Sequence, residues 1–541
     1  MKHWIRVVLC CMFMSGKIIA VEPVDADILL QGGTIFDGSG GQPYVGDVAI
    51  SGDRLIAIGS FESGQFGRVI DCKGLSICPG FIDLHNHSDQ TLLESSTRAN
   101  TNFVLQGCTT IVTGNCGAGH VDVRKYLNQI ETFGAGTNVI HLLPHGALRK
   151  QVLGTTDRPP TAKEMQQMKQ LAGEAMEAGA WGMSTGLIYV PGAYASLEEI
   201  VEIARVIAAG NGIYASHIRN EAMELLDAVN EALQIGHMAQ LPVHISHFKS
   251  SQPKAWGLVR NAAELIQKAR DNGQLVTADQ YPYIASSTSL EAMLIPTDAR
   301  AGGRKKFLDR MKSREFSEKI RRHIHKTLEG RGTQAPIRIA RYPARTDWLG
   351  LSIREIAKQQ NQDTSDIVFQ IIRKGGASVV SFGMQEEDVR FVMQLPWVAT
   401  ASDGRAYIPA GDKPHPRSYG TFPRKLGYYA RQERVLSMAS AIRSATQLPA
   451  DILGLTSRGS LVSGNYADVV VFDSKQILDQ ATFIKPHQYS RGISFLFING
   501  QLAVSDGIPT GALLGRALRP EDKRTVALMN SFKTAPGIWN Q

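Results

Sequence analysis

The segment FIDLHNHSD, residues 81–89, follows a Pro79–Gly80 turn and joins a short apolar run to two histidines. A short apolar run bounded by turn residues is typical of a buried strand. Because side chains alternate along a strand, His85 and His87 would point to the same side of the sheet. Seven further segments have a similar form: TTIVTGNC (109–116), NVIHLLPH (138–145), WGMSTGL (181–187), GIYASHI (212–218), PVHISHF (242–248), LVTADQY (275–281) and WVATASDG (397–404).

These eight predicted strands alternate with helical stretches such as TAKEMQQMKQLAGEAMEAGA (161–180). Strands that alternate with helices indicate βαβ units and a parallel sheet. Eight such units predict an α/β fold with a (β/α)₈ TIM-type barrel over residues 81–450, whose functional groups would lie at the carboxyl ends of the strands. The stretch at about 284–345 breaks the rhythm, so we expect an insertion near the barrel mouth. One surplus candidate strand, ASVVSFG (377–383), does not fit the count of eight.

The two ends of the chain have a different sequence pattern. Residues 24–80 and 451–541 contain short alternating apolar segments broken by Gly, Asp and Asn, a pattern that indicates β-hairpins. We therefore expect one small β-sandwich domain assembled from both ends. The first 20 residues combine basic residues with an apolar run and resemble a signal peptide, which predicts export to the periplasm or the extracellular space. The alternative is an irregular N-terminus of a cytoplasmic protein.

Length and charge narrow the function classes. A chain of 541 residues is expected to hold more than one domain. Its 58 basic and 50 acidic residues leave a net charge of +8, and only short basic runs such as 304–306 and 321–323 occur. We interpret these runs as solvated helix surfaces and expect no nucleic-acid site. Beyond the N-terminus, no stretch reaches the ~18 apolar residues that a transmembrane helix needs.

Six polar residues at or near the predicted strand ends form a candidate metal site. Imidazole, thiolate and carboxylate groups that converge from different strands suit zinc. Each residue has a simpler interpretation: a lone histidine can be a polar core residue, a cysteine a small buried apolar residue, and an aspartate a helix cap. Their joint occurrence at successive barrel positions favours the metal site. The six are His85, His87, Cys116, His217, His247 and Asp403.

Several motifs in this frame resemble those of the N-acyl-D-amino-acid deacylases (D-aminoacylases) of the amidohydrolase superfamily. Besides FIDLHNHSD they are GNCG (114–117), STGLIYVPGAYAS (184–196), SHIRNE (216–221), HISHFK (244–249), ASDG (401–404) and HPRSYGTFPRKLG (415–427). The resemblance implies one tight zinc ion bound by Cys116, His217 and His247, and a second, weaker metal position near His85 and His87. Related hydrolases with two metals bridge them with a lysine from the fourth strand, but WGMSTGL contains none, so Cys116 would take its place.

The predicted activity is hydrolysis of the amide bond of N-acyl-D-amino acids, which yields a carboxylate and a D-amino acid. Zinc would activate a water molecule, and Asp403 would act as general base and then general acid. The resemblance also suggests substrate contacts for Lys249 and Tyr283, and Tyr189 is a further candidate. Two alternatives stay open: a cyclic-amide hydrolase similar to dihydroorotase or hydantoinase, and a metal-free barrel that serves as a scaffold.

Overall fold

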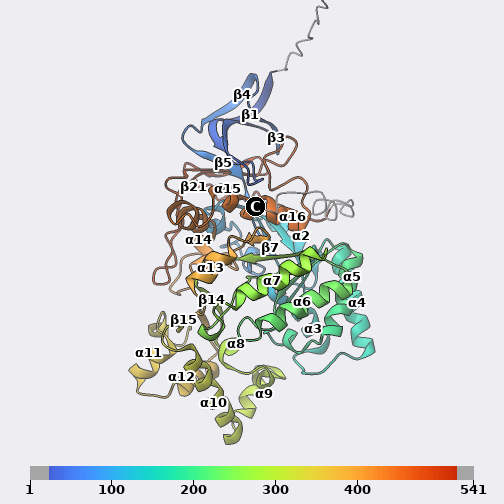
Figure 1. The fold of residues 1–541 in the computed structure, drawn as a ribbon, viewed down its shortest axis with the longest axis vertical. Helices are drawn as coiled ribbons and strands as arrows, with labels where there is room; N and C mark the ends of the chain where they lie inside the picture. Colours follow the sequence, from blue (N-terminus) through green and yellow to red (C-terminus); the bar gives the residue numbers. More distant parts are fainter. Residues whose placement is uncertain (1–22, 521–541) are drawn as a thin grey trace, which may run out of the picture.

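The computed structural model describes residues 23–520, so the expected signal peptide over 1–20 lies outside the described residues. The described chain has a mixed α/β fold with its two ends brought together (Figure 1). Within this range, no helix combines the length and apolar character needed to span a membrane.

Strands from both chain ends pair in one nine-stranded sheet. The link between the ends is the antiparallel pair of β5 (Ser76–Pro79) and β18 (Val469–Phe472). Side chains alternate across β18, so Val469 and Val471 pack into one apolar core while Val470 and Phe472 pack into another. The other strands are β1 (Val24–Ile35), β2 (Tyr44–Ser51), β3 (Arg54–Gly59), β4 (Ser63–Asp71), β19 (Ile493–Ile498), β20 (Gln501–Ser505) and β21 (Ile508–Pro509).

The central part of the chain forms two parallel sheets. One has three strands, β6 (Phe81–Asp83), β7 (Cys108–Thr113) and β8 (Asn138–His141). The other has six, in the order β17 (Val398–Thr400), β13 (Val276–Gln280), β12 (Val243–Ile245), β11 (Ile213–His217), β10 (Gly182–Gly186) and β9 (Leu143–Pro144). Connecting helices pack side by side along the six-stranded sheet (Figure 1): α4 (Ala162–Glu177), α5 (Leu197–Ala209), α6 (Leu225–Ala239) and α7 (Leu258–Asp271).

Backbone hydrogen bonds also connect the two parallel sheets. The N–H of Trp181 donates to the carbonyl of His141 at 3.0 Å, next to β8 and β10. Beyond β6 and β17, the N–H of Asp403 donates to the carbonyl of His85 at 2.7 Å. The carboxyl ends of the strands therefore meet at a shared edge, where their polar residues come together.

The break in the βα rhythm is a separate lobe at the lower end of Figure 1. Its three-stranded antiparallel sheet has the order β14 (Ala285–Ser289), β16 (Ser378–Phe382), β15 (Ile337–Arg341). Its helices include α8 (Leu290–Leu294), α9 (Gly303–Arg310), α10 (Arg314–Arg331), α11 (Ile353–Gln360) and α12 (Thr364–Arg373), and they enclose a core of their own. The lobe thus continues past residue 345, the expected end of the insertion, to residue 382. The surplus strand ASVVSFG is β16, which needs β14 and β15 as partners.

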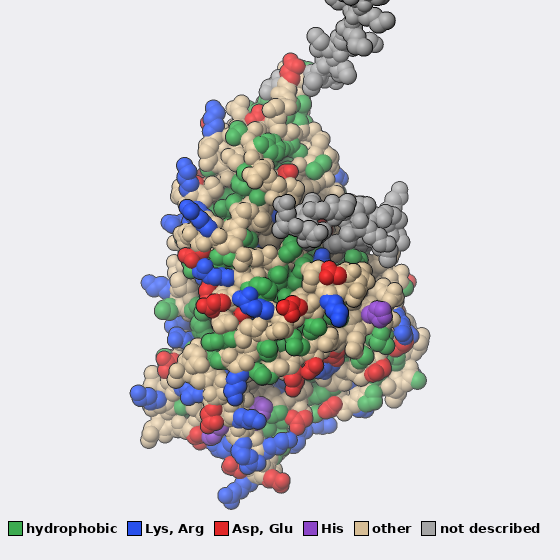
Figure 2. Space-filling view, viewed as in Figure 1, with side chains coloured by type: hydrophobic (Ala, Val, Ile, Leu, Met, Phe, Trp, Pro, Cys, Tyr) green, Lys and Arg blue, Asp and Glu red, His purple; other side chains and the backbone are tan. Residues whose placement is uncertain are grey.

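The short basic runs lie on this lobe. Figure 2 shows Lys and Arg side chains gathered at its lower end, mixed with acidic ones. Lys305 and Lys306 on α9 and Arg322 on α10 are exposed.

Candidate metal centre

Cys116 lies in the turn that follows β7. This turn, the short helix η2 (Asn115–Gly117), holds Cys116 in the left-handed region with φ +52°. The preceding Gly114 has φ +78°, and a Cβ on it would lie 2.1 Å from the carbonyl oxygen of Leu142, so only glycine fits. Asp89 fixes the same turn, because its Oδ1 accepts a hydrogen bond of 2.6 Å from the Gly114 N–H.

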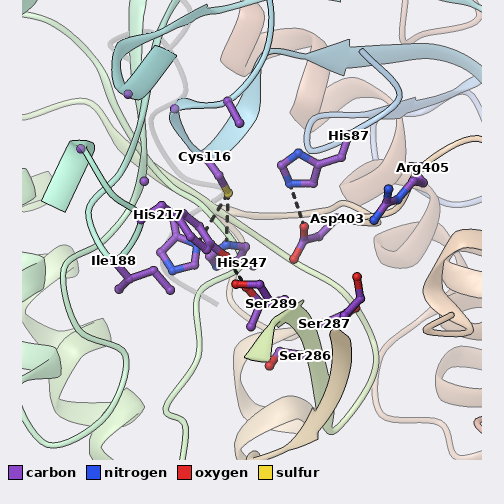
Figure 3. A pocket seen from close by; sticks show the side chains of 18 of the residues that line it. His87, Cys116, Ile188, His217, His247, Ser286, Ser287, Ser289, Asp403 and Arg405 are labelled. Atoms are coloured by element: carbon purple, nitrogen blue, oxygen red, sulfur yellow. Dashed lines mark hydrogen bonds and ion pairs between the residues drawn. The ribbon is translucent and has the colours of Figure 1, made fainter. Parts of the chain in front are cut away.

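Three imidazoles surround the Cys116 sulfur atom, two of them labelled in Figure 3. Sγ lies 3.2 Å from Nε2 of His85, 3.6 Å from Nδ1 of His217 and 3.7 Å from Nε2 of His247. Burial alone raises the pKa of a thiol, but attraction to His85 and hydrogen bonds with the imidazoles outweigh it. The pKa of Cys116 therefore lies well below its usual range, which favours the thiolate that metals bind.

Asp403 and His87 complete the cluster (Figure 3). Oδ1 of Asp403 lies 3.1 Å from Nε2 of His87 and 3.6 Å from Nε2 of His85. Its Oδ2 lies 2.7 Å from Nη1 of Arg417. Burial raises the pKa of a carboxyl group, but the charges of Arg417 and His85 hold the pKa of Asp403 well below its usual range. Asp403 is thus an ionised carboxylate that faces the histidines.

The structure brings together all six residues that the sequence predicts as metal ligands or as the general acid–base. Three sets of donor atoms each lie within 4.8 Å of one another: His85, His87 and Cys116; Cys116, His217 and His247; His85, His247 and Asp403. The buried Nε2 of His217 has no hydrogen-bond partner within residues 23–520. A thiolate, several imidazoles and a carboxylate are donors that zinc prefers, so the residues present fit a divalent ion of this kind.

Two acidic residues that sequence reasoning did not identify contact imidazole nitrogens other than those nearest the Cys116 sulfur atom. Oε1 of Glu221 lies 2.8 Å from Nδ1 of His247 and 2.5 Å from Nζ of Lys249. Oδ2 of Asp279 lies 3.5 Å from Nδ1 of His85. Carboxylates in this position fix the tautomer and orientation of ligand histidines. Both residues lie in quoted segments, SHIRNE and LVTADQY, but a single carboxylate has no spacing that would mark it.

The cluster opens into a cavity of about 590 Å³. Of the residues predicted to contact substrate, Lys249 and Tyr189 line this cavity. Tyr283 does not line it; its ring packs against His415 with 5.1 Å between ring centroids. Tyr281 lines the cavity instead, and its buried hydroxyl group has no hydrogen-bond partner in the described chain.

The lobe supplies one wall of the cavity. Three side chains of β14, Ser286, Ser287 and Ser289, lie opposite the cysteine–histidine cluster in Figure 3. Thr288 of the same strand contacts the Tyr189 hydroxyl group at 3.0 Å. The cavity therefore joins the predicted metal ligands to a wall of hydroxyl groups.

Comparison with known proteins gives consistent results. A family model described as "Amidohydrolase family" matches residues 68–504. The chain is 33% identical to the D-aminoacylase of Alcaligenes xylosoxydans xylosoxydans, over 91% of this chain and 97% of that protein. It is 34% identical to the N-acyl-D-aspartate deacylase of the same organism, over 92% and 96%. A crystal structure of the N-acyl-D-glutamate deacylase from Bordetella bronchiseptica, complexed with zinc and a phosphonate inhibitor, superposes with a TM-score of 0.78 at 32% identity, covering 92% of this chain and all of that one.

Proposed function

The chain belongs to the amidohydrolase family, and from this premise we propose that it hydrolyses the amide bond of N-acyl-D-amino acids. The observation that carries the proposal is the convergence of the Cys116, His217 and His247 donor atoms within 4.8 Å of one another. Three relatives of similar length are named D-aminoacylase, N-acyl-D-aspartate deacylase and N-acyl-D-glutamate deacylase, which supports the substrate class.

We propose zinc as the metal, held tightly by Cys116, His217 and His247, with a second, weaker position near His85 and His87. The bound zinc of the Bordetella bronchiseptica relative supports this choice. When bound, such an ion supplies Lewis-acid chemistry, because it polarises a carbonyl group and makes a water molecule more acidic.

Asp403 is the proton carrier in this proposal. Arg417 binds Oδ2, which leaves Oδ1 directed toward the histidines and the cavity. Oδ1 takes a proton from the attacking water and returns it to the nitrogen of the leaving amine, the two-way transfer that amide hydrolysis requires. The low pKa of Asp403 keeps the carboxylate ready for the first of these steps.

The substrate carboxylate needs cationic and hydroxyl partners in the cavity. Lys249 and Tyr189 line it, and Tyr281 offers a hydroxyl group without a partner. We propose these three as substrate contacts. Tyr283, which the family resemblance suggests, would act indirectly, through its contact with His415.

We also infer that the two parallel sheets form one closed (β/α)₈ barrel and that the nine-stranded sheet forms a small sandwich. The bonds from Trp181 to His141 and from Asp403 to His85 support closure on both sides. The two cores on opposite faces of β18 support the sandwich.

The test is an assay of the purified protein on N-acetyl-D- and N-acetyl-L-amino acids and on cyclic amides, with zinc measured on the same preparation. We expect D-specific release of acetate and about one tightly bound zinc per chain. Turnover of dihydroorotate or hydantoin alone would replace the deacylase with a cyclic-amide hydrolase. Absence of both zinc and turnover would support the alternative of a metal-free scaffold protein.

A further inference from the structure

The lobe contains a second cavity, of about 270 Å³, that shares no lining residue with the catalytic cavity. It lies between the C-terminal end of α10, β15 and the start of α11. Three arginines line it, Arg331, Arg338 and Arg354, against a single carboxylate, that of Glu355. An excess of positive charge in a partly buried cavity calls for a counterion.

Arg331 forms the buried back of this cavity, with 1% of its surface exposed. Its Nε donates to the carbonyl of Ala335 at 2.9 Å, and its Nη2 donates to Ser381 Oγ and to the carbonyl of Phe382, both at 2.7 Å. Nη1 has no hydrogen-bond partner, and no carboxylate within residues 23–520 forms an ion pair with Arg331. Burial without a counterion lowers the pKa of Arg331 to about 10. An unpaired cation in such a place is costly.

The other two arginines form no close ion pair in the described chain, although the charge of Arg338 helps to lower the pKa of Glu355. Arg338 is half-buried, its guanidinium lies 5.7 Å from the ring of Phe382, and its buried Nε has no hydrogen-bond partner. Arg354 is exposed and donates from Nη2 to the carbonyl of Leu328 at 2.7 Å.

Glu355 does not neutralise these charges fully. Its Oε2 accepts a hydrogen bond of 2.7 Å from the backbone N–H of Ser352, as part of the capping box that starts α11. Three guanidinium groups against one carboxylate leave two positive charges in excess.

We propose that this cavity binds a small tetrahedral dianion, of the sulfate or phosphate type. Guanidinium groups present planar pairs of N–H donors that match the oxygens of such anions. Two charges on the anion would balance the excess, and the free N–H groups of Arg331 and Arg338 would gain acceptors. Thr333 also lines the cavity, and a threonine hydroxyl group can donate to an oxyanion.

The position of this site connects it to the catalytic cavity. Arg331 donates to Ser381 and Phe382 at the end of β16. In the antiparallel pair of β16 and β14, Ser381 lies opposite Ser286, which lines the catalytic cavity. A bound anion would thus stabilise the strand pair behind the hydroxyl wall, since a ligand of the folded state raises its stability.

The experiment is isothermal titration calorimetry of the zinc-loaded protein with sodium sulfate, with sodium chloride at matched ionic strength as the blank. We expect saturable binding of one sulfate per chain. Arg338→Ala and Arg354→Ala should each weaken it about tenfold, the loss of one charge-assisted hydrogen bond. Arg322→Ala removes the same charge from the exposed surface of α10, outside the cavity, and should leave the affinity unchanged.

Three results would overturn the proposal: no saturable heat with the wild-type protein, an equal loss in Arg322→Ala, or full affinity in the Arg338→Ala/Arg354→Ala double variant. The last result would place the anion elsewhere, and titration of Cys116→Ser would show whether it binds at the metal centre. Circular dichroism of each variant checks that the fold is retained; Arg354 is exposed, so its replacement is the safest single test. None of these outcomes depends on catalytic activity.

Discussion

The backbone N–H of His247 donates a hydrogen bond of 2.7 Å to Oδ1 of Asp279. His247 has φ +37°, a backbone conformation that is unfavourable for a residue with a side chain and persists only where its surroundings hold it. The other oxygen of Asp279 lies 2.8 Å from Nε2 of His244 and 3.5 Å from Nδ1 of His85. One buried carboxylate therefore fixes the backbone of one predicted ligand and contacts the ring of another.

Asp279→Asn should weaken zinc binding about 10- to 100-fold, because the amide cannot accept at both positions and the turn at His247 loses its anchor. Competition with a chromophoric chelator measures the affinity. Asp388→Asn is the matched control: its carboxylate is also buried, and its hydrogen-bond donors, Ser250 Oγ and Gly257 N, are not predicted metal ligands. Equal loss in both variants would indicate a general effect on folding instead of a role at the metal.

Cys116→Ser should abolish tight metal binding, since serine offers no thiolate. In protein loaded with cobalt(II), the wild type should show the near-ultraviolet charge-transfer absorption of a cobalt–thiolate bond, and the variant should lack it. Cys108→Ser tests specificity, because Cys108 is equally buried and burial keeps its pKa well above the usual value. A charge-transfer band that survives in Cys116→Ser would remove this residue from the ligand set.

Asp403→Asn should retain zinc and lose turnover, with a decrease in kcat of about 10²- to 10⁴-fold, the usual contribution of a general acid–base. The decrease follows from the loss of the proton acceptor at Oδ1, while Cys116, His217 and His247 stay in place. Zinc content and kcat are measured on the same sample. If the variant kept its kcat, the proton would have to travel through another group.

Two neighbouring tyrosines offer a test of substrate contacts. Tyr281→Phe should raise KM for an N-acetyl-D-amino acid about tenfold, the effect of losing one hydrogen bond to a charged group. Tyr283→Phe should change KM less than about twofold, because its ring lies outside the cavity lining. The reverse order would restore Tyr283 as the contact that the family resemblance suggests.

The separation of these tyrosines shows where sequence reasoning reaches its limit. β13 ends at Gln280, and the N–H of Tyr283 then donates to the carbonyl of Tyr281 at 2.9 Å. Strand alternation no longer applies past that turn, so residue spacing cannot tell which ring faces the cavity. Glu221 and Asp279 could not be predicted from the sequence either, because each acts through a contact between elements distant in sequence.

The predicted metal ligands could be found from the sequence, for a physical reason. His85, His87, His217, His247 and Asp403 each stand at or just after the end of a parallel strand, and such ends meet at one edge. Residue type and position within a strand therefore sufficed. Cys116 is different: its position after a strand made it a candidate, but its left-handed turn depends on Gly114 and Asp89, and the GNCG resemblance added the stronger argument that it is a ligand.

Lys425 provides a test of pH-dependent stability away from the metal. It is 1% exposed in the π-helix η7 (Lys425–Gln432), its Nζ has no hydrogen-bond partner in the described chain, and burial lowers its pKa to about 7. The unfolded chain keeps a pKa of about 10.4 and so binds more protons between these values, which makes stability rise with pH across that window. Below pH 7 the buried charge costs at most about 5 kcal/mol. Lys425→Met should therefore raise Tm strongly at pH 6 and progressively less toward pH 10, whereas the exposed Lys475→Met should leave Tm unchanged. A gain in Tm that is the same at both pH values would show that Lys425 does not titrate in the folded protein.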